Sequence, residues 1–336
     1  MARRFRLLDL SEDCVKTVLQ CFDYFDLISF SLCSKKRLAN VRSLKLQIRL
    51  CLFCGITFYA QVDFGGNVMI LRFCEEGYDR EISLLNFQPR RLQVDYIEGE
   101  NLHWQDGNQE PPIRRWRKAN YRGNDWLRHF MFAFNCDEIE SLAVMQSKFG
   151  IDSLMDTVQN LNISQAMIFR TVSKEHTLGL LNALPCLENL SVGAPSEYAA
   201  LLRNQQKLTI QNEAKITLDI VLTVNSLAFN CSRLSIKDVN RFIKLWKKGA
   251  NLRLKHLAIG FFANHVGAVV LNENEVLRGV QHRKMPQGTV RMFEMPGNRM
   301  EEIDGGFDIV GKNGRKATVI LINPGMHSFF HMFVWH

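Results

Sequence analysis

The chain has 336 residues, 46% of them hydrophobic, and its 42 Lys and Arg against 34 Asp and Glu give a formal net charge of +8. A chain of this length can bury a sizeable core in one large domain or a few smaller ones, so we expect an ordinary globular protein. Nucleic-acid-binding proteins concentrate charge on one face, whereas the charges here are interspersed. The mild basic excess does not by itself indicate a polyanionic partner.

The first residues, MARRFRLL, precede the polar stretch DLSED rather than an apolar segment, so we expect no secretory signal. No later run reaches the ~18 apolar residues of a membrane span. We therefore expect a cytoplasmic or nuclear protein. The nine cysteines are odd in number and mostly have apolar neighbours, which predicts reduced, core-packed thiols rather than a disulfide framework.

A short helix is predicted near the N-terminus. Ser11 followed by Glu12 and Asp13 supplies an N-cap and an acidic first turn for a helix over about residues 12–22. The apolar residues that recur on one face of this helix are Val15, Val18, Leu19 and Phe22.

Two further short helices are predicted, one capped by Asp26 and one by Ser34. Isolated helices below ~12 residues are marginal in water, and a unit of ~40 residues seldom builds a self-sufficient core. Several apolar side chains exceed what these helices can bury among themselves: Leu8, Leu10, Val15, Leu19, Leu27 and Leu32. Either the rest of the chain covers them, with the helices as a cap on the next domain, or a partner protein does.

The stretch LLDLSEDCVKTVLQCFDYFDLISFSLCSKKRLANV resembles an F-box over about residues 7–44. Ser11 stands where most F-boxes have proline, and it keeps the helix start without the backbone angle that proline pre-sets. The resemblance implies binding to the Skp-type adaptor, which joins F-box proteins to the cullin and RING subunits of an SCF ubiquitin ligase. The adaptor-binding residues that it implies are Leu8, Leu10, Ser11, Val15, Leu19, Phe25, Leu27, Leu32 and Cys33.

The next segment, ITFYAQVDFGGNVMILRF, predicts a β-hairpin. The apolar residues that alternate on one face of its first strand are Ile56, Phe58, Ala60 and Val62, and a Gly65–Gly66–Asn67 turn leads to a second apolar strand. From about residue 89 to 124 the composition becomes polar and basic, which predicts a long exposed connection and a domain boundary.

The RRWRK cluster in this connection interleaves Trp116 with cations, a pattern that could stack on bases while neutralising phosphates. No RNP, KH or zinc-finger signature accompanies it. A solvated loop is therefore expected, with RNA binding kept as an alternative.

Short apolar strand patterns recur after residue 140 at intervals of roughly 18–30 residues, with helical or turn material between them. The pairs that mark them are Leu142/Val144, Met167/Phe169, Leu190/Val192, Leu208/Ile210, Leu227/Phe229 and Leu257/Ile259. This pattern is leucine-rich-repeat-like and predicts a stacked strand–helix array with a broad protein-binding surface.

The best-defined intervening helix follows Ser235, which forms a capping box with Asp238, and it ends at Gly249. Its predicted inward face is Val239, Phe242, Ile243 and Trp246, and its last turn carries Lys244, Lys247 and Lys248. The block SRLSIKDVNRFIKLWKKGANLRLKHLAI resembles the type-2 F-box-associated domain of the large nematode F-box families. That resemblance implies a target-recruiting half.

The C-terminal stretch FDIVGKNGRKATVILI predicts a hairpin around an Asn313–Gly314 turn, and FFHMFVWH predicts another strand.

Three patterns resemble catalytic or metal-binding motifs, but each is better explained by a structural role. Cys51 and Cys54 form a CxxC without a second pair, and in an extended segment they point to opposite faces. His327 and His331 lack the glutamate of a metalloprotease helix and fit a strand. Cys136 has acidic neighbours that raise a thiol pKa. We therefore expect no catalytic residues, metal or other cofactor.

The predicted fold class is α+β or α/β: a three-helix F-box, β-hairpins, and a leucine-rich-repeat-like strand–helix array with a C-terminal β-hairpin. The predicted domains are an F-box at 1–48, a hairpin segment with a polar connection at 49–124, and an F-box-associated target-binding domain at 125–336. The predicted function is a non-catalytic substrate receptor of an SCF-type ubiquitin ligase. It would bind the Skp-type adaptor, and through it cullin and RING subunits, and an unknown protein target. A non-degradative interaction protein is the alternative, and RNA binding a further one.

Overall fold

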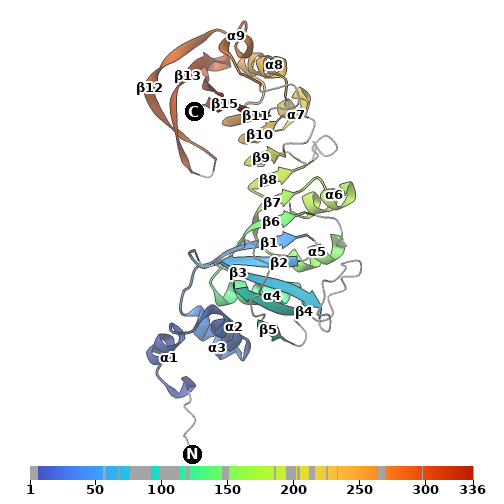
Figure 1. Ribbon diagram of the computed structural model, residues 1–336, viewed down its shortest axis with the longest axis vertical. Helices are drawn as coiled ribbons and strands as arrows, with labels where there is room; N and C mark the ends of the chain where they lie inside the picture. The colour runs from blue at the N-terminus through green and yellow to red at the C-terminus, as the bar shows by residue number, and fades with distance from the viewer. Residues whose placement is uncertain are drawn as a thin grey trace, which may run out of the picture. The chain divides into compact units, whose positions relative to one another are not determined.

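The chain forms two compact units, residues 1–165 and 166–336, in a computed structural model (Figure 1). The described residues are 7–55, 58–66, 68–75, 92–98, 114–118, 121–145, 151–184, 187–193, 202, 205–211, 216–224, 226–232, 234–262, 269–296 and 298–335. None of the helices in these ranges has the length and hydrophobicity needed to cross a bilayer.

The first unit begins with a 3-10 helix and three short α-helices, and its described residues continue as a mixed sheet with the α-helices α4 and α5. Its helices are η1 Leu7–Asp9, α1 Glu12–Leu19, α2 Tyr24–Leu32, α3 Lys35–Arg42, α4 Gly123–Ala133 and α5 Ile151–Val158. Its strands are β1 Arg49–Cys54, β2 Phe58–Asp63, β3 Val68–Glu75, β4 Leu92–Glu98, β5 Arg114–Arg117 and β6 Ile139–Val144. The strand order is β6-β1-β2-β3-β4-β5, parallel between β1 and β6 and antiparallel from β1 to β5.

The three N-terminal helices were correctly predicted, with two local differences. The α1 helix ends at Leu19 rather than near residue 22, because Phe22 N–H bonds to the Leu19 carbonyl in a tighter turn. The cap of α2 is Asp23 and not Asp26, because the Asp23 carboxylate accepts from the Asp26 backbone N–H at 2.6 Å. Caps at Ser11 and Ser34 are confirmed.

The predicted hairpin is confirmed as β2 and β3, which pair antiparallel with Phe58, Ala60 and Val62 buried. Ile56 and Asn67 lie outside the described residues. The predicted exposed connection from 89 to 124 is wrong in part, because it contains β4, β5 and the start of α4. A short polar strand with one buried aromatic gives little alternation to recognise in sequence.

The second unit alternates strands and helices and then ends in long antiparallel strands. Its helices are α6 Lys174–Ala183, α7 Leu218–Thr223, α8 Ile236–Lys247, α9 Glu273–Val276 and η4 Lys312–Gly314. Its strands are β7 Ile163–Ile168, which begins in the first unit, β8 Asn189–Val192, β9 Lys207–Ile210, β10 Ala228–Ser232, β11 His256–Phe262, β12 His282–Glu294, β13 Met300–Val310, β14 Lys316–Ile322 and β15 His327–Val334.

Two kinds of strand pairing share this unit. The series β8-β9-β10-β11 is parallel, whereas β11-β15-β14-β13-β12 is antiparallel. The α6, α7 and α8 helices lie along one side of the parallel series (Figure 1). The turn at Asn313–Gly314 is confirmed, with φ of 62° and 74° at these residues. Strand β12 was not predicted, because a mostly exposed strand interrupted by a Pro and a Gly lacks a clear apolar period.

The α8 helix matches its prediction closely. Ser235 Oγ accepts from the Asp238 backbone N–H at 3.1 Å and donates to the Asp238 carboxylate at 2.6 Å. Gly249 follows the helix with φ of 104°. The predicted inward residues Val239, Phe242, Ile243 and Trp246 are all buried.

The three-part domain division drawn from the sequence, 1–48, 49–124 and 125–336, stays a prediction. The expectation of core-packed cysteines is wrong for most of the described thiols. Cys54 and Cys231 are buried, but Cys51 and Cys136 are half-buried, and Cys14, Cys21 and Cys33 in the N-terminal helices are exposed.

Candidate protein-binding surface on the N-terminal helices

The residues predicted to bind an adaptor fall into three groups by exposure. Val15, Leu19 and Leu27 are buried, at 5%, 0% and 3% exposure. Leu10, Phe25 and Leu32 are half-buried, and Ser11 and Cys33 are exposed. The side chain of Leu8 lies outside what the structure describes. The accessible part of the predicted set is therefore at the start of α1 and around the end of α2.

Strand β5 packs directly against α2. The indole of Trp116 stacks on Phe25 with ring centroids 4.5 Å apart, and its Nε1–H donates to Ser29 Oγ at 2.7 Å. Trp116 is 6% exposed. The predicted solvated loop at RRWRK is thus wrong at its centre, because the aromatic ring covers the helices and is not displayed as a stacking platform for bases.

A chain of hydrogen bonds ties α2 to α4 through His129. Ser31 Oγ donates to the Ile28 carbonyl at 2.7 Å, so it accepts from His129 Nε2–H at 2.8 Å. His129 Nδ1 then accepts from the Tyr121 hydroxyl at 3.4 Å. This arrangement requires a neutral imidazole, and burial followed by the charge of Lys118 lowers the pKa of His129 to about 4.

Lys118 extends the same network. Its Nζ donates to the Tyr121 hydroxyl at 3.0 Å and to the Leu32 carbonyl, at the end of α2, at 3.3 Å. A cation at the C-terminal end of a helix also stabilises the partial negative charge of its last carbonyls.

The third helix is also held by α4. Asn135 Nδ2 donates to the Arg42 carbonyl at 2.9 Å, and the Arg42 guanidinium lies 3.9 Å from the ring centroid of Phe132. At the start of α2, Tyr24 stacks on Phe64 with ring centroids 3.7 Å apart, and Phe64 contacts Phe134 edge to face. The excess of apolar side chains on the three helices is therefore covered in part by the rest of this unit.

Sequence reasoning missed Trp116, His129 and Phe64 as partners of these helices. Each lies far along the chain from α2, and no periodic pattern connects residues in different elements. The available signal for Trp116 was an aromatic residue between basic residues at 114–118. That pattern also fitted a solvated loop or an RNA-binding cluster.

The other residues considered for catalysis or metal binding, among them Cys54, Cys136 and His331, are partly or fully buried within the fold. Burial raises the pKa of the Cys54 thiol, and burial followed by Asp137 and Glu138 raises that of Cys136, opposed by a backbone hydrogen bond. His331 stacks on His256, and their ring nitrogens are 3.3 Å apart. Burial lowers the pKa of His256 to about 3. No cluster of three or more metal-binding side chains occurs among the residues that the structure describes.

Comparison with protein-family models gives two matches within the chain. A model described as an F-box domain matches residues 7–36, and a model described as F-box associated matches residues 199–259. The first match covers α1, α2 and the start of α3, and the second covers the segment from β9 into β11, including α8. Neither the search of curated proteins nor the search of solved structures returned a match. Both resemblances seen in the sequence are thereby confirmed.

Proposed function

We propose that this chain, which carries an F-box domain and an F-box-associated domain, is the substrate-recruiting receptor of an SCF-type ubiquitin ligase. The observation that carries the proposal is the presence of both domains in one chain, at residues 7–36 and 199–259. F-box domains bind Skp-type adaptors within SCF complexes, and an F-box-associated domain suggests a protein target. The chain would connect the two.

The adaptor would bind the part of the helices that this chain leaves accessible. Leu10, Ser11 and Cys33 are the accessible members of the predicted set, so we assign them direct contact. Val15, Leu19 and Leu27 would act by holding the helices in position, because side chains at 5% exposure or less have little surface to offer. Phe25 already stacks on Trp116. Lys118 bonds only to the backbone carbonyl of Leu32, so the half-buried Leu32 side chain stays a candidate for contact.

The target would bind the second unit. We propose that its parallel series of strands and helices is the leucine-rich-repeat-like array expected from the sequence, an architecture that presents a broad surface for protein binding.

The proposed mechanism is proximity, and the chain itself is non-catalytic. Holding the adaptor at one site and the target at another converts attack of a target lysine on a ubiquitin thioester from a bimolecular into a tethered reaction. The bond between the lysine Nζ and the ubiquitin carboxyl carbon forms, and the thioester breaks, on other subunits. This chain supplies effective concentration and orientation.

The test is co-purification of the adaptor and cullin with the full-length chain and with Leu10→Asp/Cys33→Arg. We expect the wild type to retain both subunits and the double variant to lose them, because charged groups desolvated without a partner oppose association. Met326→Asp is a control for a charge placed on an exposed apolar side chain away from the helices, since Met326 is 67% exposed and lies in the second unit.

The thermal melt of each variant shows whether the chain remains folded. A folded double variant that binds adaptor as wild type does overturns the assignment of these residues. Failure of the wild type to bind any adaptor overturns the proposed function itself. Adaptor binding without cullin would instead support the non-degradative alternative.

A further inference from the structure

Three short segments of the second unit are basic without interruption by acidic residues. They are 244–248 (KLWKK), 278–284 (RGVQHRK) and 311–316 (GKNGRK). Each holds three Lys or Arg and no Asp or Glu. The exposed cations among them are Lys244, Lys248, Arg278, Arg283, Lys284, Lys312 and Lys316.

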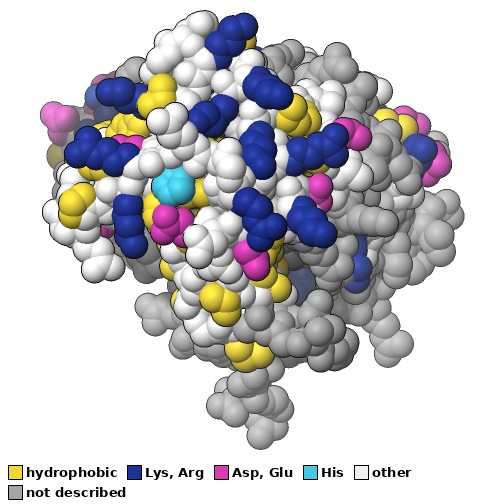
Figure 2. Space-filling model, turned by 90° about the horizontal axis from the view of Figure 1, so that it is seen from above, with side chains coloured by type: hydrophobic (Ala, Val, Ile, Leu, Met, Phe, Trp, Pro, Cys, Tyr) yellow, Lys and Arg dark blue, Asp and Glu magenta, His cyan; other side chains and the backbone are white. Residues whose placement is uncertain are grey.

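The fold brings the three segments together at one end of the unit. Lys247 Nζ donates to the Gln281 carbonyl at 3.3 Å, and the Lys312 side chain lies 3.3 Å from where a Cβ on Gly249 would stand. Across the sheet, β13 pairs with β12 on one side and with β14 on the other, with Val310 opposite Lys316. Figure 2 looks onto this end, where Lys and Arg side chains predominate over Asp and Glu. We name the three segments together the basic end.

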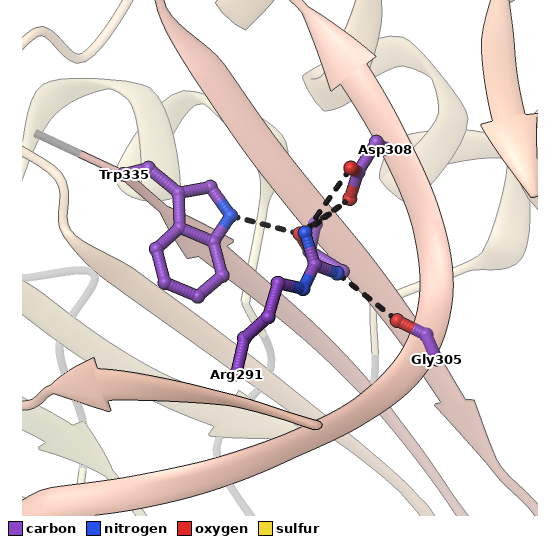
Figure 3. Close-up of polar contacts among 5 residues, drawn as sticks. Arg291, Gly305, Asp308 and Trp335 are labelled. Carbon is purple, nitrogen blue, oxygen red and sulfur yellow. Dashed lines mark hydrogen bonds and ion pairs between the residues drawn. The ribbon is translucent and has the colours of Figure 1, made fainter. Parts of the chain in front are cut away.

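Two carboxylates beside the basic end, Asp308 and Glu273, already have hydrogen-bond partners. Asp308, opposite Arg283 in the sheet, bonds to Arg291 Nη1 at 3.0 and 3.1 Å and accepts from Thr318 Oγ1 at 2.7 Å (Figure 3). Arg291 also donates to the Gly305 carbonyl, and Trp335 Nε1–H donates to Thr318 (Figure 3). Asp308 is thus already paired with Arg291 and Thr318, although Arg283 lies opposite it in the sheet.

Glu273 is paired with a histidine of the basic end itself, because it bonds to His282 Nε2 at 2.9 Å. Two hydrogen bonds, first to the Val280 carbonyl and then to Glu273, raise the pKa of His282. Among the described residues no ion pair holds any of the exposed cations of the basic end, although the exposed Glu275 lies three residues before Arg278.

Helix stability explains only part of this charge. Lys244 and Lys247 occupy the last turn of α8, where cations stabilise the helix dipole. Arg283, Lys284 and Lys316 lie on strands, which have no comparable dipole. Their clustering around the end of α8 raises repulsion between like charges, and local structure does not require it.

We propose that the basic end is the docking surface for an acidic segment of a protein partner. The proposal rests on the proposed function and narrows it, since the segment would belong to the recruited target. Val310, 51% exposed and paired with Lys316, offers an apolar contact beside the cations. In the second unit no described Phe or Trp side chain is exposed, so the stacking platforms typical of single-stranded nucleic acid binding are missing from this part.

The experiment measures fluorescence anisotropy of a short labelled peptide of Glu and Asp with one central Leu, titrated with the full-length chain. The test variant is Arg283→Glu/Lys316→Glu. The control is Lys237→Glu/Arg241→Glu, which makes the same change in net charge at exposed residues in the first half of α8. Single-stranded RNA of equal charge is a second probe.

The peptide is expected to bind, and its affinity is expected to fall at least about tenfold in the test variant and less than about twofold in the control. Binding should weaken with added salt. No peptide binding, or equal loss in both variants, overturns the proposal. Tighter binding of RNA that is lost only in the test variant also overturns it, in favour of a nucleic acid surface. Co-purification of the adaptor with the same variants is measured independently. It tests the proposed receptor function and not the basic end.

Discussion

The α2 and α8 helices are buried in different ways. The α8 helix has an apolar stripe that neighbouring elements of its unit cover, and its caps are local residues. The α2 helix is apolar on more than one side, and it also buries the hydroxyl of Ser31, whose hydrogen-bond partner His129 lies 98 residues away. A stripe with local caps can be recognised in sequence, whereas the distant polar partners that complete α2 cannot. The F-box of this chain is thus part of a larger packed unit.

Trp246→Ala should have the largest effect on stability. Removing a side chain that is 2% exposed and lies beneath the Arg315 guanidinium should lower the free energy of unfolding by ~3–5 kcal/mol. Urea denaturation measures this, with Trp246→Phe as a control that keeps most of the volume. Unchanged stability would mean that the indole is not part of the core.

Trp116→Ala tests whether the F-box helices depend on β5. We expect a loss of ~3 kcal/mol, because the stack on Phe25 and the hydrogen bond to Ser29 are both removed. Hydrogen exchange should show the amides of α2 losing protection while those of α8 do not. Equal protection of α2 in variant and wild type would make the helices self-sufficient.

Acidification should destabilise the first unit through His129. Its pKa is about 4 in the folded chain against 6.5 ordinarily, so the unfolded chain binds the extra proton between these values. The stabilisation that neutral His129 contributes is fully present above pH 6.5. It is lost as the pH falls from 6.5 toward about 4, by up to ~1.4 kcal/mol per pH unit.

His129→Gln provides the matched variant, because an amide can still donate to Ser31 but does not titrate over this range. Urea unfolding at about pH 7, 6 and 5 should show a shallower pH dependence in the variant. The remaining slope would come from other groups, including His256, whose folded pKa of about 3 acts in the same direction. The same pH dependence of stability in wild type and His129→Gln would show that His129 does not cause the acid destabilisation.

The smallest effects are expected at the two serine caps. Ser235→Ala should cost ~1 kcal/mol, and Ser11→Ala less. The Ser11 Oγ to Cys14 N distance is 3.4 Å, longer than the 3.1 Å from Ser235 Oγ to Asp238 N, and a longer hydrogen bond is weaker. Thermal melts of the two variants measure both losses of stability. A larger loss for Ser11→Ala than for Ser235→Ala would contradict the prediction.

Sequence by itself determined the features that depend on near neighbours in the chain. The caps at Ser11, Ser34 and Ser235, the stripe of α8 and the Asn313–Gly314 turn were all read from short stretches. These features arise from backbone hydrogen bonds and side-chain periodicity within a few residues, so a short window contains their cause. The F-box domain was recognised differently, from the resemblance of residues 7–44 to a known family.

Only the tertiary structure decided which faces of these elements are available to a partner. The candidate residues Val15, Leu19 and Leu27 have the apolar character of an interface, yet the chain itself buries them. Trp116 lies among cations like a nucleic acid contact, yet it packs on Phe25. The basic end assembles from three segments that are unremarkable separately. Burial and charge density depend on contacts between residues far apart in sequence, and strand pairing across a sheet creates those contacts.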